Sequence, residues 1–222
     1  MDILFVNANS SEINYQQLSK RFAAIETPIW AGMLANHMRL QGFATAILDC
    51  EAERLDTTDS AKKALEAKAR LICFVVYGQN PNDGTPRMAG AVATANLIKA
   101  FDHNIKIVFV GPHVAALPRE VLAREKSIDF ICQNEGVYTL ANLVRVNDLN
   151  DENLLLKVKG LGFRSKNYFP KTCINSIEED LMQEKGIVLN PPEQVVPRSR
   201  LEIDLPGIAW DMLPSLDKYR TS

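Results

Sequence analysis

The sequence predicts an α/β fold in which five parallel strands form a doubly wound sheet, with helices on both faces. Three observations support this prediction. Five short runs are apolar without alternation, as parallel strands buried on both faces are. Each run ends in a polar, turn-prone segment, and a helical pattern follows each such segment, which is typical of parallel β/α units. The expected strands are Ile3–Asn7, Ala44–Leu48, Leu71–Val76, Ile107–Val110 and Ile128–Ile131.

Helix signals separate these strands. Thr27 is a suitable N-cap, Pro28 suits a first helical turn, and Gly42 provides a stop. Asp56 precedes a second helix, rich in Ala, Lys and Glu, that we interpret as a solvated surface. The expected helices are Pro28–Gln41, Thr58–Ala69, Met88–Phe101, Pro118–Arg124 and Tyr138–Val146.

The first half of the helix Met88–Phe101 is rich in small residues, with Gly90 among them. Glycine inside a helix costs about 1 kcal/mol relative to alanine, so its presence suggests that something approaches the helix closely. Either the helix packs tightly on the sheet, or a ligand lies between the helix and the sheet. The sequence leaves both readings open.

The composition changes beyond Val146. We expect a first domain over residues 1–147 and, over residues 148–222, a small β appendage with a linker. Val158–Arg164 and Gly186–Asn190 are the expected strands of a hairpin. The prolines that follow favour a connector, because each removes a backbone donor and resists helix and central strand. They are Pro191, Pro192, Pro197, Pro206 and Pro214.

The composition excludes several classes of partner. The chain has 222 residues, 46% of them apolar, and a net charge of −2, so nothing draws it electrostatically to nucleic acid or an anionic membrane. No apolar run approaches the roughly 20 residues needed to span a bilayer, and the N-terminus does not resemble a signal peptide. Four scattered cysteines without a CxxC spacing are expected to fill the core in a reducing cytoplasm. They are Cys50, Cys73, Cys132 and Cys173.

The polar segments after strands one, three, four and five are expected to meet at one edge of the sheet, where such folds bind ligands. Their number suggests a broad, flat ligand. Gly111-Pro112 would let the backbone approach a ligand beside His113, or form a simple turn into the next helix. Glu135-Gly136 would accept hydrogen bonds from a ligand, or cap the helix that follows.

Several familiar motifs are absent from the sequence. No GxGxxG follows the first strand, and no GxxxxGK[ST], GxSxG or HExxH occurs. The three histidines, His37, His103 and His113, are too scattered to suggest a catalytic triad. These absences weaken readings as a dinucleotide-binding enzyme, a P-loop NTPase, an α/β-hydrolase or a zinc protease.

Three segments resemble the cobalamin-binding domains attached to radical SAM enzymes. They are TPIWAGMLA, at residues 27–35 and followed by QGF at 41–43, VFVGPHVAALP at 108–118, and IDFICQNEGVYT at 128–139. Their order and spacing agree with the family pattern over roughly residues 1–146. The tail LEIDLPGIAWDMLP is similar to the connector that leads into the radical SAM barrel in such proteins. The resemblance implies a flavodoxin-like (Rossmann-like) fold with cobalamin as the cofactor and a radical SAM barrel in cis as the partner.

Two motifs of related proteins are missing. The DxHxxG motif, whose histidine replaces the lower cobalt ligand, does not occur, and no histidine lies between Asn7 and Thr27. The resemblance then implies cobalamin with its own base displaced and no histidine from that loop on cobalt. The CxxxCxxC motif that holds a [4Fe–4S] cluster is also absent, so the chain alone is not expected to cleave S-adenosylmethionine. We therefore assign no catalytic residue and no metal ligand, and expect S-adenosylmethionine and [4Fe–4S] only in a full-length protein.

The leading hypothesis is a cobalamin-binding module of an enzyme that transfers methyl groups or performs oxidative cyclisation. A slot for the nucleotide tail is expected between the sheet and the helix Met88–Phe101, opened by small residues such as Gly78, Gly84, Ala89, Gly90 and Gly111. The alternatives are a binding or regulatory module of the same fold without cobalamin, and a nucleotide-sugar transferase that uses Glu135 and His113. The residues expected to bind the cofactor are Asn9, Tyr77, Gly78, Gln79, Asn80, Gly111, Pro112, His113, Asn134, Glu135, Gly136 and Thr139.

Overall fold

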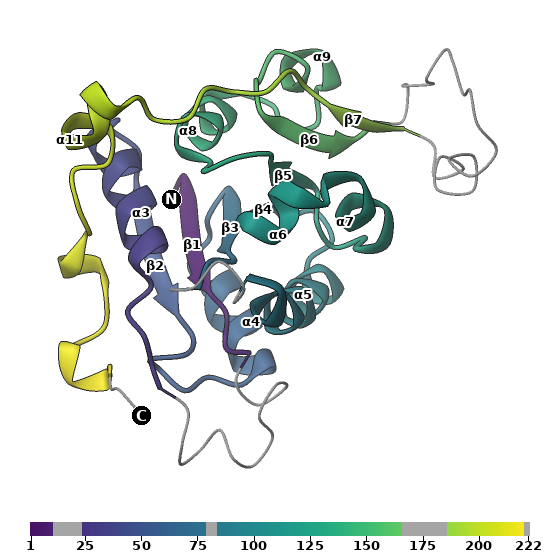
Figure 1. The fold of residues 1–222 in the computed structure, drawn as a ribbon. Coiled ribbons are helices and arrows are strands. Elements are labelled where there is room, and N and C mark those ends of the chain that lie inside the picture. Colours follow the sequence, from purple (N-terminus) through teal and green to yellow (C-terminus); the bar gives the residue numbers. More distant parts are fainter. Residues whose placement is uncertain (11–23, 79–83, 166–185, 220–222) are drawn as a thin grey trace.

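The computed structural model describes residues 1–10, 24–78, 84–165 and 186–219. In these residues the strands form one seven-stranded sheet with the order β2-β1-β3-β4-β5-β6-β7 (Figure 1). The strands are β1 (Ile3–Asn7), β2 (Thr45–Asp49), β3 (Leu71–Val75), β4 (Lys106–Val110), β5 (Phe130–Cys132), β6 (Leu161–Arg164) and β7 (Ile187–Leu189).

Strands β1 to β5 are parallel, and their order, 2-1-3-4-5, is that of the flavodoxin-like doubly wound fold. The predicted fold class and its five strands are therefore confirmed. Strands β6 and β7 form the predicted hairpin, and β6 pairs antiparallel with β5. The hairpin thus extends the same sheet at its β5 edge. The division of the chain at residues 147 and 148 stays a prediction.

Helices cover both faces of the sheet (Figure 1). Residues alternate between the faces along each strand, so Ile3 and Phe5 of β1 pack in one core while Leu4 and Val6 pack in the other. The first core lies under α3 and α8, and the second under α4, α5, α6 and α7. The helices are α3 (Ile29–Leu40), α4 (Thr57–Glu66), α5 (Gly84–Phe101), α6 (Pro112–Ala116), α7 (Pro118–Arg124), α8 (Val137–Arg145), α9 (Glu152–Leu155) and α11 (Leu201–Asp204), with short 3₁₀ turns at Arg198–Arg200, Trp210–Met212 and Leu216–Lys218.

Residues 190–219, here called the connector, leave the hairpin edge and run over α8 and then along α3 (Figure 1). The backbone N–H of Ala209 donates to the carbonyl oxygen of Gly32 at 3.1 Å, and the Asn36 side chain donates to the Gly207 carbonyl at 3.1 Å. A Cβ atom on Gly32 would lie 2.4 Å from Cγ2 of Ile208. Glycine at this position in α3 therefore lets the connector lie directly on the helix.

A buried carboxylate fixes the connector to α8. Asp204 is 2% exposed and accepts hydrogen bonds from the Arg200 guanidinium at 2.6 and 2.9 Å and from the Tyr138 hydroxyl at 2.5 Å. The hydrogen bonds from Arg200 lower the pKa of Asp204 to about 2, and the hydrogen bond from Tyr138 lowers it further by a smaller amount. Burial acts in the opposite direction but is outweighed. The carboxylate is therefore ionised at all but strongly acidic pH.

We expect this attachment to fail in acid. A carboxylate whose pKa is lower in the folded state stabilises that state fully above its unfolded pKa, near 4, and loses this effect as the pH falls toward 2. Asp204→Asn should lower the free energy of unfolding by about 1–2 kcal/mol at pH 6, because Arg200 is half exposed and solvent screens its charge. In urea titrations the gap between wild type and Asp204→Asn should shrink between pH 4 and pH 2. A gap that stays constant over that range would contradict this role.

The cysteines within the described residues behave as core side chains. Cys50, Cys73 and Cys132 are buried and free, as predicted, and burial raises the pKa of the Cys50 thiol to about 12. Cys173 lies outside the described residues.

Among the helices that the structure describes, none is both long and apolar enough to cross a membrane. The described residues also include no cluster of three or more His, Cys, Asp or Glu side chains that could hold a metal ion.

Candidate functional site

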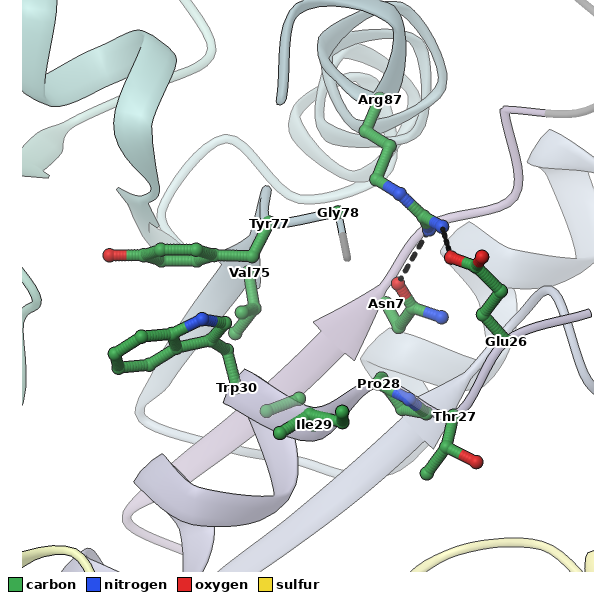
Figure 2. Close-up of a pocket in the computed structure, with 11 residues that line it drawn as sticks. Asn7, Glu26, Thr27, Pro28, Ile29, Trp30, Val75, Tyr77, Gly78 and Arg87 are labelled. Carbon is green, nitrogen blue, oxygen red and sulfur yellow. Dashed lines mark hydrogen bonds and ion pairs between the residues drawn. The ribbon is translucent and has the colours of Figure 1, made fainter. Parts of the chain in front are cut away.

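A cavity of about 240 Å³ lies at the carboxyl ends of β1 and β3, beside the start of α3 (Figure 2). Its position is the one at which doubly wound sheets bind ligands, because the helices that flank β1 lie on opposite faces and leave a crevice there. The lining residues come from β1, from β3 and the residues after it, from the first turn of α3 and the segment before it, and from α5. They are Asn7, Glu26, Thr27, Pro28, Ile29, Trp30, Ala31, Val75, Tyr77, Gly78 and Arg87.

An aromatic pair forms one wall of the cavity. The rings of Trp30 and Tyr77 stack with their centroids 4.6 Å apart and an angle of 24° between their planes (Figure 2). Burial raises the pKa of the Tyr77 phenol above its usual value, so this wall stays uncharged at neutral pH. The pair provides flat apolar surface with one hydroxyl.

A charged cluster forms the opposite wall. The Arg87 guanidinium lies 3.3 Å from a carboxylate oxygen of Glu26 and 3.5 Å from the side-chain oxygen of Asn7 (Figure 2). Behind this wall, it also lies 3.1 Å from a carboxylate oxygen of Glu51. The Arg87 side chain is 18% exposed, so these contacts are only partly screened by water. Burial raises the pKa of Glu51, and the Arg87 charge opposes that effect. This wall offers hydrogen-bond donors and acceptors side by side.

Two of the predicted site residues line this cavity. Tyr77 and Gly78 follow β3 directly and contribute to it. Gln79 and Asn80, predicted with them, lie outside the described residues.

The segments after β3 and β4 meet at Gly111. Its φ of +153° and ψ of 167° lie in a region that essentially only glycine occupies, and a Cβ atom there would lie 2.3 Å from the carbonyl oxygen of Val76. Pro112 then begins α6, and His113 Nδ1 lies 2.9 Å from the Thr85 hydroxyl of α5. Gly111 and Pro112 therefore form a tight strand-to-helix turn, and the backbone that approaches Gly111 is the protein's own. His113 lies at the rim, in contact with the start of α5.

The segment after β5 contacts the connector. The side-chain N–H of Asn134 donates to the Glu193 carbonyl at 2.9 Å, and a Glu135 carboxylate oxygen accepts from the backbone N–H of Val196 at 3.1 Å. In this structure both side chains hold the connector, and neither lines the cavity. The segment QNEG alone could not predict these hydrogen bonds, because the partner residues lie about 60 positions further along the chain.

Gly136 and Thr139 belong to the packing around α8. Gly136 has a left-handed φ of +81°, and a Cβ atom there would lie 2.6 Å from Cγ2 of Val110. Thr139 is fully buried, and its hydroxyl donates to the Lys159 carbonyl at 3.0 Å. The structure therefore brings neither residue to the surface of the cavity.

Asn9 and Ser10, which follow β1 closely in the chain, lie against Gly90 of α5. A Cβ atom on Gly90 would lie 2.4 Å from both the Asn9 carbonyl oxygen and the Ser10 hydroxyl oxygen. The Ser10 hydroxyl also donates to the Arg87 carbonyl at 2.9 Å, and the Asn9 side chain donates to the Leu55 carbonyl at 3.1 Å. The close approach inferred from Gly90 is thus made by the chain itself, and among the residues of α5 it is Arg87 that lines the cavity.

Sequence reasoning missed most of the cavity. Asn7 was expected only to end a strand, and Trp30 was named only within the segment 27–35 that resembles the family. Glu26 and Arg87 carry no local signal, because each acquires its role from contact with the other across 61 positions of the chain. The segment 27–35 was singled out by resemblance, and it supplies five of the lining residues.

Comparison with known proteins identifies the family. A model of the B12 binding domain matches residues 18–144, more than half of the chain. The chain belongs to the B12-binding domain family. Its cofactor is cobalamin, as the resemblance of the three segments implied.

Three known proteins resemble this chain over part of their length, one in sequence and two in fold. An uncharacterized methyltransferase of Pyrococcus horikoshii is 25% identical over 193 residues, which are 87% of this chain and 35% of that protein. The cobalamin-dependent S-adenosylmethionine radical enzyme OxsB, solved with aqua-cobalamin and S-adenosylmethionine bound, superposes over 95% of this chain and 24% of its own, with a TM-score of 0.64 and 18% identity. The radical S-adenosylmethionine methyltransferase TsrM of Kitasatospora setae, solved with cobalamin and a [4Fe–4S] cluster, covers 89% of this chain and 30% of its own, with a TM-score of 0.56 and 16% identity. The chain thus spans about a quarter to a third of the length of these relatives.

The B12-binding domain of this chain offers groups that fit a corrinoid. Cobalamin combines a flat ring with many peripheral amides, and the cavity pairs the Trp30–Tyr77 surface with the donors and acceptors around Arg87. At about 240 Å³ the cavity is smaller than pockets that enclose even drug-sized ligands. It can therefore receive only part of cobalamin, and the rest would lie over the rim.

Proposed function

We propose that this domain holds cobalamin at the rim of the sheet and presents it to a radical SAM barrel of the same polypeptide. The observation that carries this proposal is the cavity at the ends of β1 and β3 in a chain of the B12-binding family. Trp30 and Tyr77 would contact an apolar part of the cofactor. Arg87 would donate to its amide or phosphate oxygens, while Asn7 and Glu26 would accept hydrogen bonds from its amide groups.

The cobalt site of this domain is proposed to lack a histidine from the loop after β1. The sequence contains no histidine between Asn7 and Thr27. When bound, cobalamin supplies a cobalt centre that can carry a methyl group. The chain's part is to bind and orient that centre, because its sequence has no CxxxCxxC for an iron–sulfur cluster. We therefore place cleavage of S-adenosylmethionine in the barrel.

Methyl transfer is the reaction that we propose for the whole enzyme. The curated relative at 25% identity is named a methyltransferase, and TsrM is one by name. The three described cysteines are free thiols, which supports a reducing cytoplasmic location. Oxidative cyclisation remains the competing reaction for the same arrangement of domains.

The test uses the polypeptide that carries this domain together with its barrel, reconstituted anaerobically with iron and sulfide. With a chemical reductant and S-adenosylmethionine, it should form S-adenosylhomocysteine in the presence of hydroxocobalamin. Omitting the corrinoid should abolish that product. Equal amounts with and without corrinoid would refute the methyl-transfer proposal. A rise in Tm with UDP- or GDP-sugars but not with cobalamin would instead favour a nucleotide-sugar transferase.

A further inference from the structure

The last described residue of the connector is linked to the cavity wall by hydrogen bonds. After following α3 it reaches the carboxyl end of β2, where the Tyr219 hydroxyl donates to Oδ2 of Asp49 at 2.8 Å. Burial and the nearby negative charge of Asp49 raise the pKa of Tyr219, so its phenol keeps the proton that it donates. A segment that begins at the hairpin edge of the sheet is thereby hydrogen-bonded to the opposite edge.

Asp49 connects Tyr219 to Asn7 in the cavity wall, because its carboxylate accepts a hydrogen bond from each. It is 1% exposed, and its second oxygen, Oδ1, accepts from the Asn7 side-chain N–H at 2.8 Å and from the backbone N–H of Ala52 at 3.1 Å. Asn7 lines the cavity, and its side-chain oxygen lies 3.5 Å from the Arg87 guanidinium. Three hydrogen-bonded side chains therefore lead from the connector through β2 and β1 to the proposed ligand surface.

The orientation of Asn7 depends on Asp49. A side-chain amide presents either its oxygen or its NH₂ group to a given neighbour, and the two choices have opposite hydrogen-bonding character. Because the carboxylate of Asp49 accepts from the NH₂ group, the oxygen of Asn7 faces Arg87. Displacement of Asp49 would remove the acceptor of the NH₂ group, so only the 3.5 Å contact with Arg87 would still orient the amide oxygen.

We infer that Tyr219 is a positioning residue for the cofactor site. By holding Asp49 against Asn7, it fixes the Asn7 oxygen toward Arg87 and the cavity. Attachment of the end of the connector and affinity for cobalamin are consequently coupled, and by linkage each favours the other. This inference rests on the proposed place of cobalamin in the cavity.

Binding of hydroxocobalamin to the 222-residue chain tests the coupling. Tyr219→Phe should raise Kd about fivefold, the effect of losing one hydrogen bond that supports the site. The matched control is Asp211→Asn, which removes an exposed ion pair between the connector and Arg39 and should change Kd less than twofold. In an Asn7→Ala background, Tyr219→Phe should have no further effect. An unchanged Kd for Tyr219→Phe, or the same loss in both backgrounds, would overturn the inference.

A second measurement needs no cofactor. The Asn7 side-chain amide signals in a ¹H–¹⁵N spectrum are identified by their absence from Asn7→Ala. They should shift in Tyr219→Phe and stay in place in Asp211→Asn. Asn7 signals that do not move in Tyr219→Phe would refute the inference whatever cobalamin does. A wild-type chain that binds no hydroxocobalamin would refute the proposed function alone, and the amide signals would still decide whether Tyr219 positions Asn7.

Discussion

Replacing Trp30 by alanine is expected to weaken the binding of hydroxocobalamin more than any other single truncation in the cavity. The change removes half of the stacked pair with Tyr77 and the largest side chain that lines the cavity. Aromatic residues at the centre of a binding site commonly contribute about 2 kcal/mol or more, which corresponds to roughly a 30-fold rise in Kd. Isothermal titration of the chain with hydroxocobalamin measures this directly.

The second tryptophan of the chain provides the control. Trp210 lies on the connector, is 54% exposed, and does not line the cavity. Trp210→Ala should leave Kd within about twofold, since isolated surface substitutions have small effects. Trp30→Phe should recover much of the lost affinity because it restores an aromatic face to Tyr77. Equal losses in Trp30→Ala and Trp210→Ala would place the cofactor elsewhere.

Replacing Gly111 by alanine should have the largest effect on stability. The added Cβ atom would lie 2.3 Å from the Val76 carbonyl oxygen, a backbone atom that cannot move aside as a flexible side chain can. Together with a backbone conformation reserved for glycine, this should lower the free energy of unfolding by about 3 kcal/mol. Urea denaturation followed by circular dichroism gives the value.

Gly42→Ala separates the two causes. Gly42 also has a positive φ, +87°, but a Cβ atom there would have no neighbour within 4 Å. This variant should lose only about 1 kcal/mol, the usual cost of placing alanine in the left-handed region. If both variants lower the free energy of unfolding by the same amount, the close contact between Gly111 and the segment after β3 is not the reason that glycine is needed there.

The sheet could be predicted from the sequence because its strands are buried on both faces. The run at Leu71–Val75 is fully apolar, which is typical of a central parallel strand that is covered on both faces. Helix starts were less certain. α5 begins at Gly84, four residues before the expected start at Met88. Pro86 does not prevent this, because the backbone N–H groups of a first helical turn make no hydrogen bond within the helix. The short helix α6 was missed because Gly111-Pro112 reads as a turn.

The site could be predicted as a place but only partly as a set of residues. The carboxyl ends of parallel strands must share one edge, so the sequence pointed to Tyr77 and Gly78, which line the cavity. Asn134 and Glu135 also lie at a strand end, yet the connector returns over them and takes their hydrogen bonds. Arg87 acquires its role from Glu26 and Glu51, which belong to two other segments. Such contacts depend on how the chain returns on itself and leave no local pattern.

The central claim is that this domain binds cobalamin at the rim of its parallel sheet, and gel filtration with hydroxocobalamin tests it most directly. The 222-residue chain should elute with close to one equivalent of corrinoid. Its visible spectrum should be base-off, because the family resemblance implies that the cofactor's own base is displaced and no histidine from the loop after β1 can replace it on cobalt. Trp30→Ala, run in parallel, should lose most of the corrinoid during elution. A wild-type chain that elutes without corrinoid would contradict the account.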